Sequence, residues 1–131
     1  MIKEIIHAHL IECLEKLGIA HEKEFTVEIP NNTDHGDYST NCAMILAKEN
    51  KAAPKAIAEK LIKELKKKKD YKKIEIAGPG FINFQLSPAF FQRIFWEIRE
   101  SGENFATMDF GKGEKILLEF VSANPTGPLN I

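Results

Sequence analysis

The sequence of 131 residues has only two cysteines, one tryptophan and two tyrosines. Cys13 and Cys42 allow at most one disulfide, which excludes a disulfide-built scaffold and is typical of a reduced, cytosolic protein. No stretch approaches the roughly 18 uninterrupted apolar residues that indicate a membrane span. Glu4, His7 and His9 stand where a secretory signal would need an apolar run. With 44% hydrophobic residues, the composition also excludes disorder and a collagen-like repeat.

Charge of both signs is plentiful and nearly balanced, with 18 basic against 19 acidic side chains, but lysine gathers in one segment. Residues 51–73 carry ten lysines and three acidic residues, whereas the segments on both sides are acidic. A short basic segment in an acidic chain is a candidate contact for a polyanion. The alternative is a solvated, lysine-rich helix end, and composition leaves both open.

Apolar residues at helical spacing predict four helices. The first covers residues 2–17 and ends at Gly18. The second is capped by Asp37 or Ser39 and ends near residue 50.

The third predicted helix begins at Pro54, which suits a first helical turn, and runs out in lysines 66–69. The fourth begins at Ser87-Pro88 and ends at Gly102. Its apolar face is predicted to consist of Phe91, Ile94, Phe95 and Ile98.

Three short strands are predicted between these helices, at residues 25–29, 74–76 and 81–86. The order is helix, strand, helix, helix, strand, strand, helix. It predicts an α+β fold, a small antiparallel sheet covered by helices on one face.

A glycine-rich stretch after residue 102 precedes a nearly continuous apolar run over residues 116–121. Such a run is typical of a strand buried on both faces of a parallel sheet. We therefore expect a first domain over residues 1–110 and the truncated start of a second over 111–131. Without its sheet, the run is expected to fold back, to be disordered, or to pair with a second copy of the chain.

In the predicted strand 81–86 the side chains alternate between two faces. Ile82, Phe84 and Leu86 share one face, so Phe81 points outward with Asn83 and Gln85. An outward aromatic ring beside amides suits an unpaired base, because the ring stacks and the amides bond the base edge. The alternative is that Phe81 packs under a neighbouring loop.

Two other groups of residues carry less chemistry. His35-Gly36-Asp37 resembles a catalytic or metal-binding fragment, but it has no partner cluster, so we expect a loop and no metal site. Cys13 and Cys42 lie on apolar faces and are expected to be inert core residues.

The segment from Glu119 to Ile131 runs from a buried strand into a loop rich in proline and glycine. Glu119, Ser122 and Asn124 would lie at the carboxyl end of the strand, where open α/β sheets bind ligands. Glu119 could receive a guanidinium group in a bidentate pair.

Three stretches together resemble the N-terminal end of arginyl-tRNA synthetases, which are class I enzymes: HGDYSTNCAM (35–44), GPGFINFQLS (78–87) and LLEFVSANPTGPLNI (117–131). The resemblance implies that residues 1–110 recognise the tRNA elbow through the D-loop. It also implies that residues 111–131 begin a Rossmann-type catalytic domain and that the chain ends inside its ATP signature.

The resemblance assigns roles residue by residue. Phe81 and Asn83 match positions that touch a D-loop base, and Gln85 joins them by strand geometry alone. Glu119 matches a contact to the substrate arginine, and Ser122 and Asn124 match contacts near its amino acid moiety. Asn130 stands where the ATP signature normally begins with a catalytic histidine, and its amide can donate a hydrogen bond without a positive charge.

The implied full-length enzyme is a cytoplasmic monomer that activates arginine with ATP and Mg and transfers it to tRNA(Arg). The 131-residue chain alone is expected to bind no cofactor and to have no ligase activity. We expect its lysines to contact tRNA phosphates: Lys66, Lys67, Lys68, Lys69, Lys72 and Lys73. The alternatives are a free-standing RNA-binding module and an interaction domain whose lysines meet an acidic protein.

Overall fold

The computed structural model describes residues 1–105, 113–115 and 117–118. The chain divides into a compact unit, Met1–Glu100, and a second unit, Ser101–Ile131, whose described part includes the 3₁₀ helix η2 (Gly102–Asn104). No helix in the described part of the chain combines the length and the apolarity needed to cross a bilayer.

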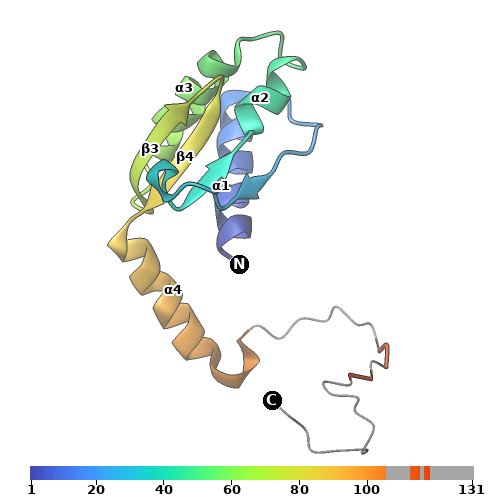
Figure 1. The fold of residues 1–131 in the computed structure, drawn as a ribbon, viewed down its shortest axis with the longest axis vertical. Coiled ribbons are helices and arrows are strands. Elements are labelled where there is room, and N and C mark those ends of the chain that lie inside the picture. Colours follow the sequence, from blue (N-terminus) through green and yellow to red (C-terminus); the bar gives the residue numbers. More distant parts are fainter. Residues whose placement is uncertain (106–112, 116, 119–131) are drawn as a thin grey trace, which may run out of the picture. The chain divides into compact units, whose positions relative to one another are not determined.

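The compact unit is built on a four-stranded antiparallel sheet with the strand order β1-β2-β4-β3 (Figure 1). The strands are β1 (Val27–Glu28), β2 (Tyr38–Thr40), β3 (Tyr71–Ala77) and β4 (Phe81–Leu86). A short 3₁₀ helix, η1 (Thr33–His35), lies between β1 and β2 along the chain.

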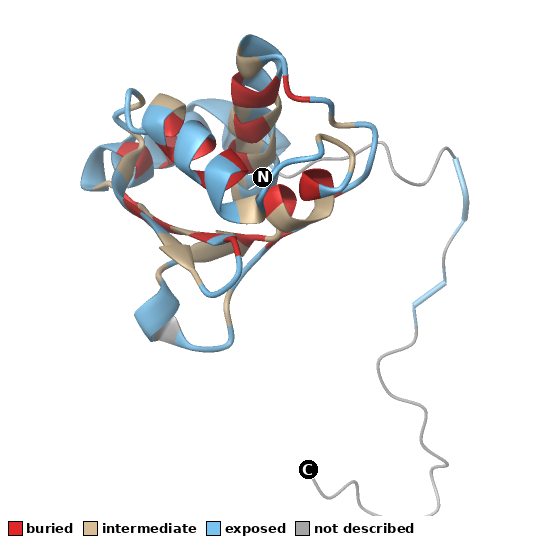
Figure 2. Ribbon diagram, turned by 90° about the horizontal axis from the view of Figure 1, so that it is seen from above, coloured by how far each residue is buried: buried red, intermediate tan, exposed pale blue. Residues whose placement is uncertain are grey.

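Helices cover one face of the sheet, and the segment around η1 lies on the other face (Figure 2). The covering helices are α1 (Ile2–Leu17), α2 (Cys42–Ala47) and α3 (Pro54–Leu65). Their apolar stripes meet the inward side chains of β4, Ile82, Phe84 and Leu86, in one buried core. The α+β class predicted from the sequence is confirmed, while the Rossmann-type part of that prediction lies outside the described residues.

The predicted first and third helices match α1 and α3. Gly18 ends α1 in a left-handed conformation with φ +64°, and its N–H donates to the carbonyl of Glu15. Pro54 is the first residue of α3. The stripe of α3 is buried as predicted, and it consists of Ile57, Ala58, Leu61, Ile62 and Leu65.

The predicted cap of the second helix is wrong, and so is its extent. Asp37 directly precedes β2 and Ser39 lies within it, while α2 starts only at Cys42 and ends at Ala47. Residues 38–40 pair with β4, which lies more than 40 residues further along the chain. A strand of three polar residues has no periodicity of its own, so the long-range pairing decides its structure.

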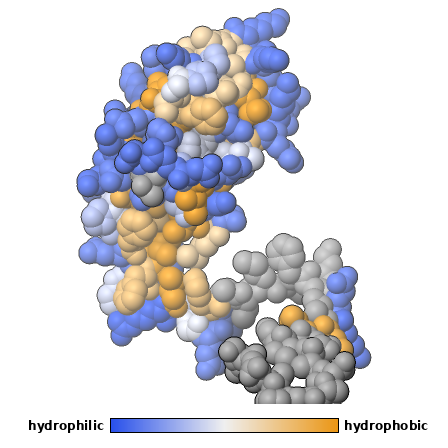
Figure 3. Space-filling view, in the orientation of Figure 1, coloured by the Kyte–Doolittle hydropathy of each residue, from blue (hydrophilic) through white to orange (hydrophobic). Residues whose placement is uncertain are grey.

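The predicted apolar face of the fourth helix is also wrong in part. Helix α4 (Pro88–Ser101) begins as predicted, and the Oγ atom of Ser87 accepts the N–H of Phe90 at 3.2 Å. Only Phe90 and Ile94 are buried, because only the first two turns of α4 reach the core. The other large apolar side chains of α4 stay at the surface (Figure 3), and they include Phe91, Phe95, Trp96 and Ile98.

Candidate nucleic-acid interface

The outward face of β4 presents the three side chains that strand geometry predicts. Exposure alternates strictly along the strand, with Ile82, Phe84 and Leu86 buried. Phe81 is 38% exposed, and Asn83 and Gln85 are partly exposed beside it. The alternation predicted from the sequence is therefore confirmed.

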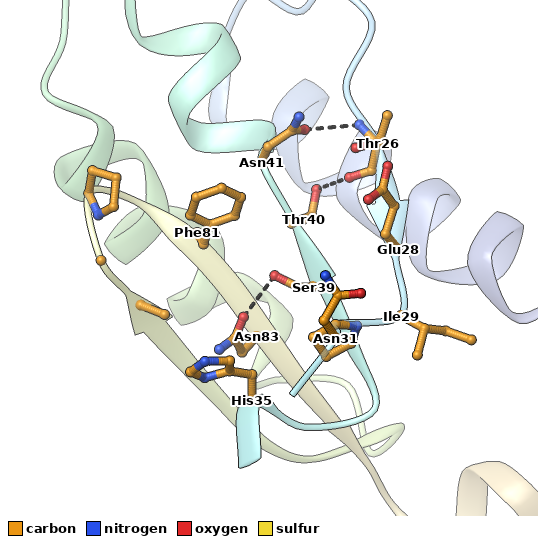
Figure 4. Close-up of a pocket in the computed structure, with 14 residues that line it drawn as sticks. Thr26, Glu28, Ile29, Asn31, His35, Ser39, Thr40, Asn41, Phe81 and Asn83 are labelled. Atoms are coloured by element: carbon orange, nitrogen blue, oxygen red, sulfur yellow. Dashed lines mark hydrogen bonds between the residues drawn. The ribbon is translucent and has the colours of Figure 1, made fainter. Parts of the chain in front are cut away.

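A pocket of about 560 Å³ opens above this face of the sheet (Figure 4). Phe81 and Asn83 line it from β4, and the turn at residues 77–79 borders Phe81. The opposite wall comes from β1, β2 and the segment that joins them. Its polar side chains are Thr26, Glu28, Asn31, His35, Ser39, Thr40 and Asn41.

Hydrogen bonds hold the walls of the pocket in place. Thr40 donates from Oγ1 to the carbonyl of Thr26 at 2.6 Å, and Asn41 accepts the N–H of Thr26 through Oδ1 at 3.0 Å. Ser39 donates from Oγ to Oδ1 of Asn83 at 2.8 Å (Figure 4). These bonds fix the orientation of polar groups around the pocket, which lowers the cost of ordering them in a complex.

The string His35-Gly36-Asp37 joins η1 to β2 and has a structural role. Gly36 has φ +90°, and a Cβ atom there would lie 2.5 Å from the carbonyl oxygen of Phe84. Asp37 accepts the N–H of Leu86 through Oδ2 at 2.7 Å and donates its own N–H to Phe84 at 2.8 Å. Asp37 thus extends the pairing of β2 with β4. Within the described residues, no group of three His, Cys, Asp or Glu side chains is arranged to hold a metal ion.

Half of the lysines predicted to contact phosphate form ion pairs with carboxylates. Lys67 pairs with Glu64 at 2.5 Å, Lys68 with Glu12 at 2.6 Å, and Lys73 with Glu75 at 2.9 Å. The hydrogen bonds from Lys67 and then Lys16 lower the pKa of Glu64 to about 2. The other three, Lys66, Lys69 and Lys72, make no ion pair with any described residue.

The lysines are not gathered around Phe81. Residues 66–69 lead into β3 at the end of the sheet where Tyr71 pairs with Leu86, whereas Phe81 pairs with Ala77 at the other end. At about 3.4 Å per residue, the length of β4 separates the two ends by roughly 17 Å. Lys73 lies between them, directly opposite Gln85, and both line a smaller cavity of about 100 Å³.

Both cysteines are buried, free and outside this site. Burial raises the pKa of Cys42 to about 12, and burial also raises that of Cys13. Both thiols are therefore protonated near neutral pH, as expected for inert core residues. The imidazoles of His7 and His9 have different neighbours: the first stacks on Phe25, and Nδ1 of the second bonds to the Tyr71 hydroxyl at 2.8 Å.

Sequence reasoning missed the wall of the pocket that faces β4. The sequence singled out Ser39 only as a helix cap, His35 only as part of a loop, and Asn41 only within the resemblance stretch 35–44, and none of these placed them opposite β4. The predicted arginine and ATP residues, Glu119, Ser122, Asn124 and Asn130, lie outside the described residues, as does most of the run 116–121. Those predictions remain untested.

Comparison with known proteins gives one family. The family model described as "Arginyl tRNA synthetase N terminal domain" matches residues 2–86. A protein of Chlorobaculum parvum named arginine–tRNA ligase is 47% identical over 121 residues, which are 92% of this chain and 22% of the relative. One of the same name from Listeria welshimeri is 51% identical over 109 residues, which are 82% of this chain and 20% of the relative.

Solved structures share the fold. A crystal structure of arginyl-tRNA synthetase from Plasmodium falciparum matches 70% of this chain and 17% of its own, with a TM-score of 0.60 and 21% identity. The Thermus thermophilus arginyl-tRNA synthetase matches 72% of this chain and 15% of its own, with a TM-score of 0.57 and 23% identity. The chain thus spans about a fifth of the length of the curated relatives it matches. It belongs to the arginyl-tRNA synthetase N-terminal domain family.

Proposed function

We propose that this chain is the RNA-recognising N-terminal part of an arginine–tRNA ligase and that the open face of its sheet holds an unpaired base of the tRNA elbow, in the D-loop. The exposure of Phe81 carries the proposal. The other aromatic residue of β4, Phe84, is buried, whereas Phe81 is 38% exposed in a pocket next to the Asn83 amide. An aromatic ring beside an amide offers a base both a stacking surface and a partner for its edge.

The size of the pocket supports a base as the ligand. Its volume of about 560 Å³ lies within the range of roughly 300–1,000 Å³ that is usual for small-molecule sites. The alternative reading of Phe81, as a residue covered by a loop, fits less well because the ring remains partly accessible beside the turn at 77–79.

The free lysines supply the second part of the interface. An RNA strand that stacks one base on Phe81 and continues along β4 approaches the segment carrying Lys66, Lys69 and Lys72 at the other end of the strand, which is roughly 17 Å long. The paired lysines contribute less, since Glu64, Glu12 and Glu75 offset their charge.

The names of the relatives support the arginine–tRNA ligase activity that we include in the proposal for the whole protein. The full-length protein activates arginine with ATP and Mg in the cytoplasm, acts as a monomer, and transfers the arginyl group to tRNA(Arg). Glu119, Ser122, Asn124 and Asn130 belong to that activity. The chain of 131 residues has none of it alone, and detection of arginine-dependent ATP–pyrophosphate exchange by this chain would contradict that statement.

Titration of the chain with a tRNA(Arg) transcript tests the proposed interface. Phe81→Ala is expected to weaken binding by about 1–3 kcal/mol, because it removes the stacking surface. Phe95→Ala is the matched control, since Phe95 is 62% exposed but lies on α4, and it should bind like the wild type. Equal binding by Phe81→Ala and the wild type would overturn the proposal, as would tighter binding to polyglutamate than to tRNA.

A further inference from the structure

Helix α4 carries more apolar surface than its contacts with the sheet and the other helices bury. Phe90 and Ile94 are buried, whereas Phe91, Phe95 and Ile98 are 48%, 62% and 37% exposed. Positions 91, 95 and 98 follow the i, i+4, i+7 spacing of a single helix face, so these three side chains form one stripe, the α4 stripe. Figure 3 shows apolar surface running along this helix.

The other side of α4 is polar, apart from one tryptophan. At about 100° per residue, Gln92, Trp96 and Arg99 lie on the side of the helix away from the stripe. The guanidinium of Arg99 lies 4.9 Å from the centre of the Trp96 ring, a cation–π contact. Helix α4 is therefore amphipathic, and its stripe has the composition of a surface that a protein normally covers.

Hydrogen bonds and an ion pair hold the base of α4 to the compact unit. Ser87 donates from Oγ to the carbonyl of Lys69 at 2.7 Å, and its N–H donates to the carbonyl of Asp70 at 2.9 Å. Arg93 then binds the Asp70 carboxylate at 3.0 Å. Turning α4 about its axis to bury the stripe would break these bonds and expose Phe90. The stripe is thus held outward and is available to another part of the protein.

The position of α4 along the chain indicates what covers the stripe. The matched family model ends at residue 86, and α4 begins at Pro88. The match to the Chlorobaculum parvum relative spans 121 residues, so it includes α4, yet it covers only 22% of that relative. Because the family is named for an N-terminal domain, α4 is the helix that leads from this domain to the remaining four fifths or so of such a protein.

A tether favours that neighbour over any separate partner. A part of the same polypeptide that follows α4 closely is present at an effective concentration of roughly millimolar or above. A second copy of the chain or an unrelated protein has to reach the same stripe from dilute solution and loses translational freedom when it binds.

We propose that the α4 stripe is the docking surface for the catalytic part of the same polypeptide. The inference rests on the proposed function, because it requires the chain to be the N-terminal part of a longer ligase. Strand β4, which carries the open face, runs into α4 through Ser87. The docked helix would therefore join the RNA-recognising unit to the part that activates arginine.

Hydroxyl-radical footprinting read by mass spectrometry tests the inference, with the 131-residue chain and the whole protein labelled side by side. In the whole protein, oxidation of Phe91 and Phe95 should be about 5-fold slower or more, since the core of an interface excludes water. Trp96 is the internal control: it lies on the other side of the helix and should react within about 2-fold in both proteins. Equal oxidation of the two phenylalanines in both proteins would overturn the inference.

Dilution of the whole protein separates the possible occupants. Docking within one polypeptide should protect the stripe equally at all protein concentrations. Protection that disappears on dilution would identify a second copy as the occupant and would overturn the inference. The proposed function fails on different results, namely tRNA binding that ignores Phe81→Ala or a whole protein without arginine-dependent ATP–pyrophosphate exchange.

A charge placed on the stripe gives a second test. Phe95→Asp should leave the urea unfolding of the 131-residue chain unchanged, because the ring is exposed there. In the whole protein it should raise the oxidation of Phe91 to within about 2-fold of its rate in the chain, since a buried carboxylate disfavours docking. Gln92→Asp, exposed on the other side of α4, is the matched control and should keep the protection. Unchanged protection of Phe91 in Phe95→Asp would contradict the inference.

Discussion

At Gly36 the connection between β1 and β2 passes close to the backbone of β4. A Cβ atom at this position would lie 2.5 Å from the carbonyl oxygen of Phe84, and the backbone has φ +90°. Only glycine meets both conditions without displacing the neighbouring strand. The same contact positions Asp37 for its bond to Leu86 and thereby aligns β2, which carries Ser39.

Gly36→Ala is therefore expected to destabilise the compact unit more than the same change at a helix end. Left-handed strain costs about 1–2 kcal/mol, and displacing the Phe84 backbone adds roughly 1–3 kcal/mol. Gly18→Ala is the control, because Gly18 also has positive φ but nothing lies within 4 Å of the added Cβ. Urea unfolding measures both variants, and equal losses of stability would contradict the role of the close approach.

At the residue scale, the sequence predicted the features that depend on a single strand. The outward positions of Phe81, Asn83 and Gln85 follow from the period-two geometry of β4. The bond from Ser39 to Asn83 could not be predicted, because it joins residues 44 positions apart and depends on strand register. Register is a property of two strands and their turns, not of either alone.

At the scale of elements, Glu64 ties two helices together. Its carboxylate on α3 binds Lys16 of α1 at 2.9 Å and Lys67 at 2.5 Å, and its side chain is only 13% exposed. These hydrogen bonds lower its pKa to about 2. An unfolded glutamate has a pKa near 4.3, so the folded state holds the carboxylate charged over a wider pH range.

The lowered pKa predicts how stability depends on pH. The contribution of Glu64 is complete above the unfolded pKa of about 4.3 and is lost as the pH falls toward 2. Thermal unfolding of the wild type should therefore lose more stability between pH 5 and pH 2 than that of Glu64→Gln. Glu59→Gln, exposed on the same helix, should keep the pH profile of the wild type. Identical profiles for all three chains would refute the role of Glu64.

The elements themselves were predictable to different degrees. The long amphipathic helices α1 and α3 follow from periodicity that extends over several turns. The three-residue strand β2 exists because β1 and β4 pair with it on both sides. For α4 the sequence predicted an amphipathic helix correctly, but the number of turns that reach the core depends on tertiary packing.

At the scale of the whole molecule, the net charge of −1 conceals the distribution that matters for a polyanion. Among the six lysines predicted to contact phosphate, the ion pairs of Lys67, Lys68 and Lys73 leave Lys66, Lys69 and Lys72 without an ion pair to any residue that the structure describes. The sequence predicted the cluster of lysines. Which of these lysines lack an ion pair depends on contacts between distant elements, such as that of Lys68 with Glu12.

Replacing the three free lysines should reduce the salt dependence of tRNA binding. For Lys66→Gln with Lys69→Gln and Lys72→Gln, we expect the slope of log K against log salt to decrease in magnitude by about 2–3, since each phosphate contact contributes roughly 0.7–0.9. The control removes the same charge elsewhere, with Lys3→Gln, Lys23→Gln and Lys48→Gln. Equal slopes for the two triple variants would show that only net charge matters.

The most direct test of the interface is a map of the surface that tRNA touches. A ¹⁵N-labelled chain is titrated with an unlabelled tRNA(Arg) transcript, and the shifts of the backbone amide resonances are followed. We predict the largest changes along the outward face of β4, at Phe81, Asn83 and Gln85, and at Ser39 of β2. Changes confined to the helical face of the sheet or to α4, with those four amides unmoved, would contradict the assignment of the open face as the base-binding site.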